Sequence, residues 1–206
     1  MIPTLHVVTD DEILRREGFI PMAIQVLEAG RTGIALHLRG PGTHGRVLEE
    51  LAGSLAGPAG ETGSRLLVND RVDLALALDL SGAHLGQRSL QASVARSILG
   101  PDRLLGLSVH GQDELDRAAE AALDFLVVGT IFSTPSHAGR VPAGLKMVRE
   151  MVEFTDLPVL AIGGMDRTRV RSVLDAGAHG MAVRGGIWDA VDPGAAVGGY
   201  LDALKE

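Results

Sequence analysis

The chain of 206 residues contains no cysteine, which excludes disulfide bonds, thiolate zinc sites and a cysteine nucleophile. Aromatic residues make up only 3% of it, few for a protein that stacks on single-stranded nucleic acid. The formal net charge of -7 argues against a general affinity for nucleic acid or anionic membranes. No apolar run approaches the roughly 18 residues of a membrane span, and the N-terminal stretch lacks the features of a secretion signal. We therefore expect a cytoplasmic protein whose partner is a small molecule.

Short runs rich in leucine and β-branched residues alternate with longer segments of helical periodicity. Apolar residues make up 46% of the chain, and several short runs are apolar almost throughout, as is typical of parallel strands covered on both faces. Strict alternation over residues 1–206 predicts one α/β domain, a closed (β/α)8 TIM barrel. The expected strands are Leu5–Val8, Gly33–His37, Arg65–Val68, Gly82–His84, Leu104–Leu107, Phe125–Val128, Val159–Ile162 and Gly180–Val183. The expected helices lie near 20–29, 44–56, 71–78, 89–98, 112–121, 144–153, 167–176 and 187–203.

Polar side chains gather just past the expected strands. In a parallel barrel, the loops that follow the carboxyl ends of the strands together form the active site. Wet loops explain serine and aspartate there, but they explain the histidines and arginines less well, so the asymmetry favours a ligand site. These residues are Thr9, Asp10, His37, Arg39, Asn69, Asp70, Arg71, His84, Gln87, Ser108, His110, Thr130, Ser133, Thr134, Ser136, His137 and Arg184.

Two glycine doublets follow the last two expected strands. Gly163 and Gly164 follow one strand, and Gly185 and Gly186 follow Arg184 after the other. Glycine lets backbone N–H groups approach an anion closely, and the loops after strands seven and eight are a recurrent phosphate site in this fold. The pattern predicts a phosphate site, with Arg184 either pairing with the phosphate or lying on the outer surface.

Two features after the strands have alternative interpretations. The long connection from Thr130 to Ala143 is either a lid over a bound ligand or a plain surface loop. Asp70, with Asn69, could supply oxygen ligands to Mg²⁺, but its spacing favours a helix N-cap.

Other residues are expected to be structural. His6 and His179 begin strands, away from the ligand end of the barrel, and His44 is expected to be exposed. The stretch 57–64, GPAGETGS, predicts a loop, and Gly177 predicts a left-handed residue that ends a helix.

With these residues assembled, the chain resembles the thiamine-phosphate synthase/TenI family nearly from end to end. The VNDRVDLAL block at 68–76, HLGQ at 84–87 and VGTIF at 128–132 followed by Thr134 are quite specific together. Further matching stretches are VVTDDE at 7–12, LHLRG at 36–40, LGLSVH at 105–110, PVLAIGGM at 158–165 and AGAHGMAVRGGI at 176–187. The resemblance implies the same barrel and a phosphorylated thiazole as the ligand.

The family has two main chemistries. The synthase joins a hydroxymethylpyrimidine diphosphate to thiazole phosphate: pyrophosphate leaves with Mg²⁺ neutralising its charge, and the thiazole nitrogen attacks the resulting cation. TenI-like members instead shift a double bond in a thiazole carboxylate phosphate by proton transfer, which needs an acid–base group and no metal. The resemblance therefore implies Mg²⁺, held by Asp70, for a synthase and no cofactor for a tautomerase.

Departures from the synthase pattern concentrate on its pyrophosphate side. The family's Gln-Leu-Arg-x-Lys has become His37-Leu38-Arg39-Gly40-Pro41, and the aspartate that follows HLGQ after one residue is Ser89. A lysine after strand six is His137, and a phosphate-binding serine after strand eight is Gly185. The residues that match the family and the glycine loops predict a substrate- and phosphate-binding set of Arg39, Asn69, Ser108, Thr130, Thr134, Gly163, Gly164, Arg184, Gly185 and Gly186.

Loss on the pyrophosphate side favours a TenI-like thiazole tautomerase over a thiamine-phosphate synthase, with a non-catalytic thiazole- or thiamine-phosphate-binding barrel as the third interpretation. The TenI pattern has its catalytic histidine at the position of Thr130. We therefore expect His137 as the base, with His110 or His37 as substitutes. The sequence leaves the oligomeric state open and allows a homo-oligomer. Apolar residues of the last helix (Ala195, Val197, Tyr200 and Leu201) are expected to pack on the barrel.

Overall fold

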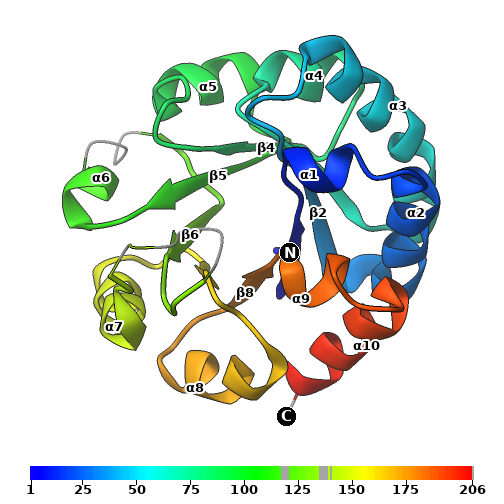
Figure 1. Ribbon diagram of the computed structural model, residues 1–206. Coiled ribbons are helices and arrows are strands. Elements are labelled where there is room, and N and C mark those ends of the chain that lie inside the picture. The colour runs from blue at the N-terminus through cyan, green and yellow to red at the C-terminus, as the bar shows by residue number, and fades with distance from the viewer. Residues whose placement is uncertain (117–120, 135–138, 140, 206) are drawn as a thin grey trace.

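A computed structural model describes residues 1–116, 121–134, 139 and 141–205 and shows a parallel, closed eight-stranded barrel (Figure 1). Each strand pairs with the next along the chain, and β8 closes on β1 with Leu5 opposite Met181. The expected fold class is therefore confirmed. The strands are β1 (Leu5–Val8), β2 (Ile34–Leu38), β3 (Arg65–Asn69), β4 (Gly82–Leu85), β5 (Leu104–Val109), β6 (Phe125–Gly129), β7 (Val159–Ile162) and β8 (Gly180–Val183).

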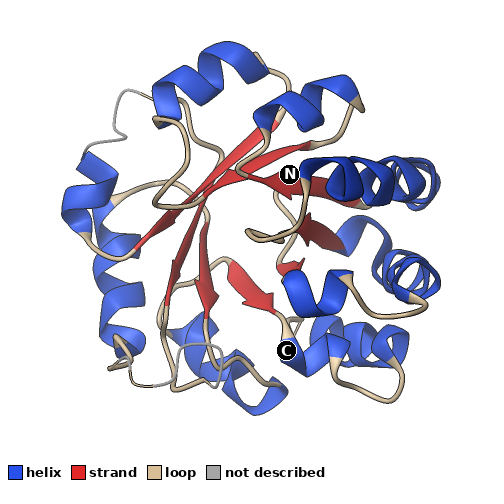
Figure 2. Cartoon of the chain, turned by 45° about the horizontal axis from the view of Figure 1, so that its top comes forward, coloured by secondary structure: helices blue, strands red, loops and turns tan. Residues whose placement is uncertain are grey.

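Helices form a ring around the barrel and shield the outward faces of its strands from solvent (Figure 2). Among the described residues, no helix is both long enough and apolar enough to cross a lipid bilayer. The helices are α1 (Asp11–Leu14), α2 (Phe19–Gly30), α3 (Gly45–Thr62), α4 (Val72–Ala77), α5 (Ala92–Leu99), α6 (Gln112–Asp116), α7 (Gly144–Phe154), α8 (Val170–Asp175), α9 (Gly185–Trp188) and α10 (Pro193–Ala203). Short 3-10 turns cover Arg31–Gly33 and Arg167–Arg169.

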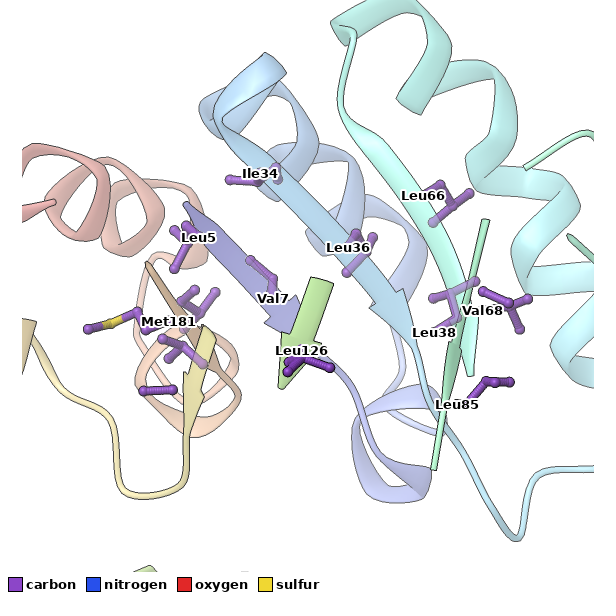
Figure 3. Packing of buried hydrophobic residues seen from close by; sticks show 14 of the residues in the cluster. Leu5, Val7, Ile34, Leu36, Leu38, Leu66, Val68, Leu85, Leu126 and Met181 are labelled. Atoms are coloured by element: carbon purple, nitrogen blue, oxygen red, sulfur yellow. The ribbon is translucent and has the colours of Figure 1, made fainter. Parts of the chain in front are cut away.

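The main hydrophobic core lies between the strands and the helices (Figure 3). Leu5, Val7, Leu36 and Leu126 belong to it and have no measurable exposure. Successive side chains of a strand point to opposite faces, so the residues between these positions point into the barrel. The strands are apolar on both faces because one face packs against the helices and the other lies inside the barrel.

The inside of the barrel holds a second cluster that surrounds polar groups. Leu67, Phe125 and Leu160 belong to this cluster and are fully buried. Gly106 makes room for the Phe125 ring, because a Cβ at that position would overlap it. His6 and His37 are also fully buried here, beside Phe125. This interior therefore contains imidazoles where most barrels of this type carry aliphatic side chains.

The loop expected at 57–64 is wrong, because most of this stretch belongs to helix α3. The helix runs from Gly45 to Thr62 with Pro58 inside it. Ala59 is 3% exposed and packs into the core, so burial of this face outweighs the weak helix formers around it. The helix continues through these residues and ends at Gly63, which has a left-handed backbone with φ 74°. Glycine and proline content misled the prediction because tertiary packing overrode local propensity.

The C-terminal segment forms two helices where one was expected over 187–203. Asp192 caps α10 by accepting a hydrogen bond from the N–H of Ala195 at 2.9 Å, and Pro193 occupies the first turn. Val197 and Tyr200 of α10 are buried and Leu201 packs against the core, which confirms the expected packing for these three residues, whereas Ala195 is exposed and the expectation is wrong there. The prediction for Gly177 is also confirmed: it follows α8 with φ 93°.

Candidate functional site

The carboxyl ends of the strands meet at one end of the barrel, its mouth. There Thr9, which follows β1, forms hydrogen bonds with the residue that follows β2. Its hydroxyl donates to the carbonyl of Arg39 at 3.0 Å and accepts from the Arg39 N–H at 2.8 Å. This buried contact fixes the loop after β2 while leaving the Arg39 side chain exposed at the mouth. Arg39 is thus free to meet a ligand from solvent.

Asp70 does not cap a helix, which corrects the interpretation that its spacing favoured. The N-cap of α4 is Arg71, and Asp70 has a left-handed backbone with φ 65°. Its carboxylate instead accepts the N–H of Gly86 at 2.9 Å and a short hydrogen bond from the Ser89 hydroxyl. The loop after β4 therefore decides where this carboxylate points, and Asp70 lies exposed at the mouth.

One carboxylate with a neighbouring hydroxyl is a modest cation site. Among the described residues, no group of three or more histidine, cysteine, aspartate and glutamate side chains could hold a metal ion. Mg²⁺, however, commonly uses one or two protein carboxylates and takes its remaining oxygens from water and substrate phosphates. The hard oxygens of Asp70 and Ser89 fit an ion that arrives with a diphosphate.

Asn69 and Ser108 converge on His84 just below the mouth. The Asn69 amide nitrogen lies 3.3 Å from His84 Nδ1, and Ser108 Oγ lies 3.0 Å from His84 Nε2. Asn69 and His84 are buried, whereas Ser108 is half-buried, so its hydroxyl can still reach the mouth. Burial, partly offset by the charge of Asp70, lowers the pKa of His84 to about 4.

His37 lies inside the barrel, which corrects its expected place on the ligand rim. The side chain has no exposed surface and stands between His6 and His84, 2.8 Å from His6 Nδ1 and 3.2 Å from His84 Nδ1. Strand β2 extends one residue past the predicted end, to Leu38, and His37 points inward. Burial, reinforced by both neighbouring imidazoles, lowers the pKa of His37 well below its usual value. A neutral, enclosed ring can act on a ligand only through its neighbours.

His110 stands at the mouth in a cluster with Gln87 and Glu114. The Gln87 amide nitrogen lies 3.1 Å from His110 Nδ1 and donates to Glu114 at 2.9 Å. His110 Nδ1 also lies 3.4 Å from a Glu114 carboxylate oxygen, so an amide donor and a carboxylate acceptor both face this nitrogen. Partial burial opposes ionisation of Glu114, but the N–H and the ring of His110 lower the pKa of this carboxyl. His110, Gln87 and Glu114 therefore form one polar cluster at the mouth.

The glycine loop after β7 has the backbone expected of an anion cradle. Gly163 and Gly164 adopt φ values of 100° and 64°, which favour glycine. A Cβ on Gly164 would lie 2.5 Å from the carbonyl oxygen of Ser133. Arg169 donates to the Gly164 carbonyl and lies over the Phe132 ring at 4.6 Å, which fixes the far side of the loop.

The loop after β8 places Gly185 and Gly186 in the first turn of α9. N–H groups of a first turn have no acceptor within the helix, so they can face an anion. Arg184, in contrast, forms ion pairs with Asp10 at 2.6 Å, Glu12 at 3.2 Å and Asp189 at 3.5 Å. Three carboxylates occupy this guanidinium, so the structure places Arg184 in a charge network rather than free beside the glycines.

The connection after β6 is closed at its base by backbone hydrogen bonds. Ala143 donates to the carbonyl of Thr130 at 2.9 Å, and Gly144 donates to that of Ile131 at 3.0 Å. Thr130 and Thr134 are half-buried on the side of this connection nearest the barrel. His137, the expected base, lies outside the described residues.

Several expected structural residues occupy the places predicted for them. His6 and His179 lie at the opposite end from the mouth, where His179 Nε2 contacts the carbonyl of Ile2 at 2.9 Å. His44 is exposed and caps α3 through a contact with the Arg46 N–H. Sequence reasoning missed Glu114 and Arg169. For Glu114 the spacing of four residues from His110 was an available signal, whereas nothing local marks Arg169.

The chain is similar to known proteins over nearly its whole length. A family model described as thiamine monophosphate synthase matches residues 5–187. A relative named thiamine-phosphate synthase, from Desulfitobacterium hafniense, is 36% identical over 98% of this chain and 97% of its own. A solved thiamine phosphate pyrophosphorylase from Pyrococcus furiosus superimposes with a TM-score of 0.83 at 30% identity, covering 98% of this chain and 95% of that one.

Some relatives are longer. A thiamine-phosphate synthase from Gloeobacter violaceus is 39% identical over 90% of this chain, and the match spans 55% of that relative. The chain thus spans about half the length of several curated relatives that it matches, with 50% and 40% covered in two others. The barrel is the part shared with them.

Proposed function

Because the chain belongs to the thiamine monophosphate synthase family, we propose that it joins a hydroxymethylpyrimidine diphosphate to a thiazole phosphate. The products of this transfer are thiamine phosphate and pyrophosphate. The observation that carries the proposal is the orientation of Asp70, whose carboxylate turns to the mouth beside Ser89 instead of capping α4. This reading replaces the tautomerase as the preferred interpretation, because relatives of similar length are named as synthases.

Asp70 and Ser89 act at the diphosphate end of the proposed site. These two side chains would hold Mg²⁺, which when bound neutralises the charge that develops on departing pyrophosphate. The exposed guanidinium of Arg39 supplies a further positive charge at the same mouth. With two family lysines absent, these groups carry more of the charge stabilisation than they do in the family pattern.

The thiazole phosphate occupies the opposite side in this proposal. In this proposal, backbone N–H groups of Gly163, Gly164, Gly185 and Gly186 receive the phosphate. Arg184 holds this loop in place through Asp10 and Asp189. Ser108 and Asn69 both contact His84 just below the mouth, where in this proposal the ring to be transferred would rest.

A second candidate, the thiazole tautomerase, draws support from Ser89. Its hydroxyl stands where the family pattern has a second carboxylate, so diphosphate chemistry lacks one metal ligand. His137 is the proposed base for this reaction, and His137→Ala should then abolish turnover with little effect on ligand binding. The non-catalytic phosphate binder, a cytoplasmic location and a homo-oligomer stay predictions.

A coupling assay tests the first proposal. Purified protein receives both substrates with Mg²⁺, and thiamine phosphate is detected after oxidation to fluorescent thiochrome. We expect Mg²⁺-dependent product, and a loss of at least about 100-fold in kcat for Asp70→Asn, the size seen when one group that stabilises transition-state charge is removed.

Asp73→Asn is the matched control, because Asp73 lies three residues away and pairs only with Arg71 among the contacts described. We expect this variant to keep full activity. Product formation that ignores Mg²⁺ or Asp70 would contradict the proposed role of this carboxylate. Complete lack of product from protein that binds thiazole phosphate would shift the assignment to the tautomerase, tested next with thiazole carboxylate phosphate.

A further inference from the structure

Three histidines form a continuous hydrogen-bonded column through the inside of the barrel. His6 Nδ1 lies 2.8 Å from His37 Nε2, and His37 Nδ1 lies 3.2 Å from His84 Nδ1. His84 Nε2 then contacts Ser108 Oγ at 3.0 Å. This histidine column (His6, His37 and His84) thus leads from the end of the barrel opposite the mouth, called here the closed end, to the Ser108 hydroxyl near the mouth.

Enclosure keeps the imidazoles of the column neutral. His6 and His37 have no exposed surface, and His84 is 4% exposed. Burial, with the nearby His84, lowers the pKa of His6 to about 3. A neutral imidazole carries one N–H and one bare nitrogen, so it donates on one side and accepts on the other.

Neutral rings in contact determine one another's tautomers. Two facing nitrogens form a hydrogen bond only when one carries a proton and the other does not. The proton position on one ring of the column therefore fixes the next, and only two orders satisfy every contact. In one order His84 donates to Ser108, and in the other Ser108 donates to His84.

Asn69 selects between the two orders. Its amide nitrogen, which can only donate, faces His84 Nδ1 at 3.3 Å and makes this atom an acceptor. His84 then carries its proton on Nε2, while His37 and His6 carry theirs on Nδ1. The atoms left without partners in this order are the acceptors His6 Nε2 and Asn69 Oδ1. In the opposite order His84 Nδ1 would carry a proton and face the donor nitrogen of Asn69, so these two groups could not form a hydrogen bond.

We propose that the histidine column is a positioning device that holds Ser108 as a hydrogen-bond acceptor from His84, so that the Ser108 O–H donates to the ligand. The ligand atom that this arrangement selects is an acceptor, such as a bare nitrogen of a heteroaromatic ring, rather than an N–H or a protonated amine. His37 and His6 act through their neighbours and touch no ligand. The proposal rests on the proposed function only in taking Ser108 as a ligand contact.

Nitrogen-15 NMR of histidine-labelled protein reads the tautomers directly, without ligand or activity. We expect signals for His84 with the proton on Nε2 and for His37 and His6 with the proton on Nδ1. His179→Asn serves as the matched control, because His179 lies at the same closed end but outside the column. This variant should leave the three signals unchanged. The opposite set of tautomers, with His6 donating toward the nearby Pro3 carbonyl, would overturn the proposal.

A double-mutant cycle then tests the link to Ser108. We expect His37→Leu, which removes a donor to His84, to lower kcat by about tenfold with little change in KM, the rate equivalent of one lost hydrogen bond. His37→Gln retains an amide donor and should restore most of the rate. In a Ser108→Ala background, His37→Leu should have almost no further effect, whereas independent multiplication of the two losses would refute the coupling.

Separate outcomes keep the two proposals distinguishable. An absence of synthase activity with the expected tautomers leaves the column intact and refutes only the proposed function; ligand affinity then replaces kcat as the readout of the cycle. Synthase activity together with the opposite tautomers would support the proposed function and refute the proposed role of the histidine column. Should His37→Leu fail to fold, the tautomers of the unmodified chain still decide the order.

Discussion

Individual residues decide how this barrel departs from its family pattern. Ser89 stands where the pattern has aspartate, yet it keeps its place by donating a hydrogen bond to Asp70. Pro41 stands where the pattern has lysine, in a turn beside Gly42, whose N–H donates to Asp11 at 3.0 Å. The geometry of the mouth is thus retained while its charge is reduced, which predicts weak metal binding rather than a missing site.

Restoring the absent carboxylate should strengthen Mg²⁺ binding. In Ser89→Asp, two carboxylates would face one point at the mouth, and an additional anionic oxygen ligand raises the affinity for a hard cation. We expect the Mg²⁺ concentration that gives half-maximal coupling activity to fall by about tenfold, which corresponds to roughly 1.4 kcal/mol. Ser89→Asn, of similar size but uncharged, is the control and should not produce this gain.

Gly164 is a second position where a single residue matters. We expect Gly164→Ala to raise KM for thiazole phosphate by about tenfold and to lower the free energy of unfolding by about 2 kcal/mol. Its φ of 64° is strained for alanine, and the new Cβ would lie 2.5 Å from the Ser133 oxygen.

Gly18→Ala separates the effect of backbone strain from that of the proposed phosphate contact. Gly18 has a similar φ of 77°, but a Cβ there would meet nothing within 4 Å. We expect it to lower the free energy of unfolding by about 1 kcal/mol and to leave KM unchanged. An equal KM effect in both variants, measured by steady-state kinetics, would argue against a phosphate contact at Gly164.

At the scale of elements, α3 shows how packing overrules composition. Its last turns contain Gly57, Pro58 and Gly60, all poor helix formers, and Pro58 lacks the N–H for one intrahelical hydrogen bond. Leu55 and Ala59, one turn apart, are buried against the barrel and keep this segment helical. The end of α3 is therefore helical at a local energetic cost.

Replacing Pro58 should reveal that cost. Pro58→Ala restores a backbone donor and removes the ring clash, so we expect the free energy of unfolding in urea to rise by about 2 kcal/mol. Pro41→Ala, in an exposed turn, should instead lower it by about 0.5 kcal/mol, because proline there restricts the unfolded chain. A loss of stability in Pro58→Ala would indicate that the helix is bent at this point to suit its neighbours.

For the whole molecule, the buried imidazoles couple folding to pH. Histidines of the unfolded chain take up protons near their usual pKa of 6.5, whereas burial lowers the pKa of His6 to about 3 and that of His84 to about 4. At pH values between the native and the unfolded pKa, the histidines bind protons in the unfolded state but not in the native state. The stabilisation is fully present above pH 6.5 and is lost as the pH falls toward the pKa values of the native state.

Urea unfolding at about pH 7 and about pH 5 measures this linkage. We expect the free energy of unfolding to fall toward acid by roughly 1 kcal/mol per pH unit for each buried histidine. His44→Gln should leave the slope unchanged because this side chain is exposed, whereas His6→Leu should reduce it. A flat profile in the unmodified chain would show that the column takes up protons in the folded state.

The sequence by itself determined the barrel. Apolar runs such as those of β6 and β7, separated by amphipathic segments, are compatible with strands that are buried on both faces, and the alternation leaves little choice of topology. The glycine doublet after β7 likewise indicates the backbone found there, since few other residues adopt the φ values of Gly163 and Gly164. These features depend on local chemistry, which a single sequence displays.

Only the tertiary structure decided what the polar side chains face. Asp70 points to the loop after β4 rather than to its own helix, Arg184 meets Asp10 from the other end of the chain, and His37 lies inside the barrel. Each of these partners is distant in sequence, and a shift of one residue at the end of β2 separates the ligand mouth from the core. Spacing along a chain specifies which residues end a strand, but the closure of the barrel sets which of them share a hydrogen bond.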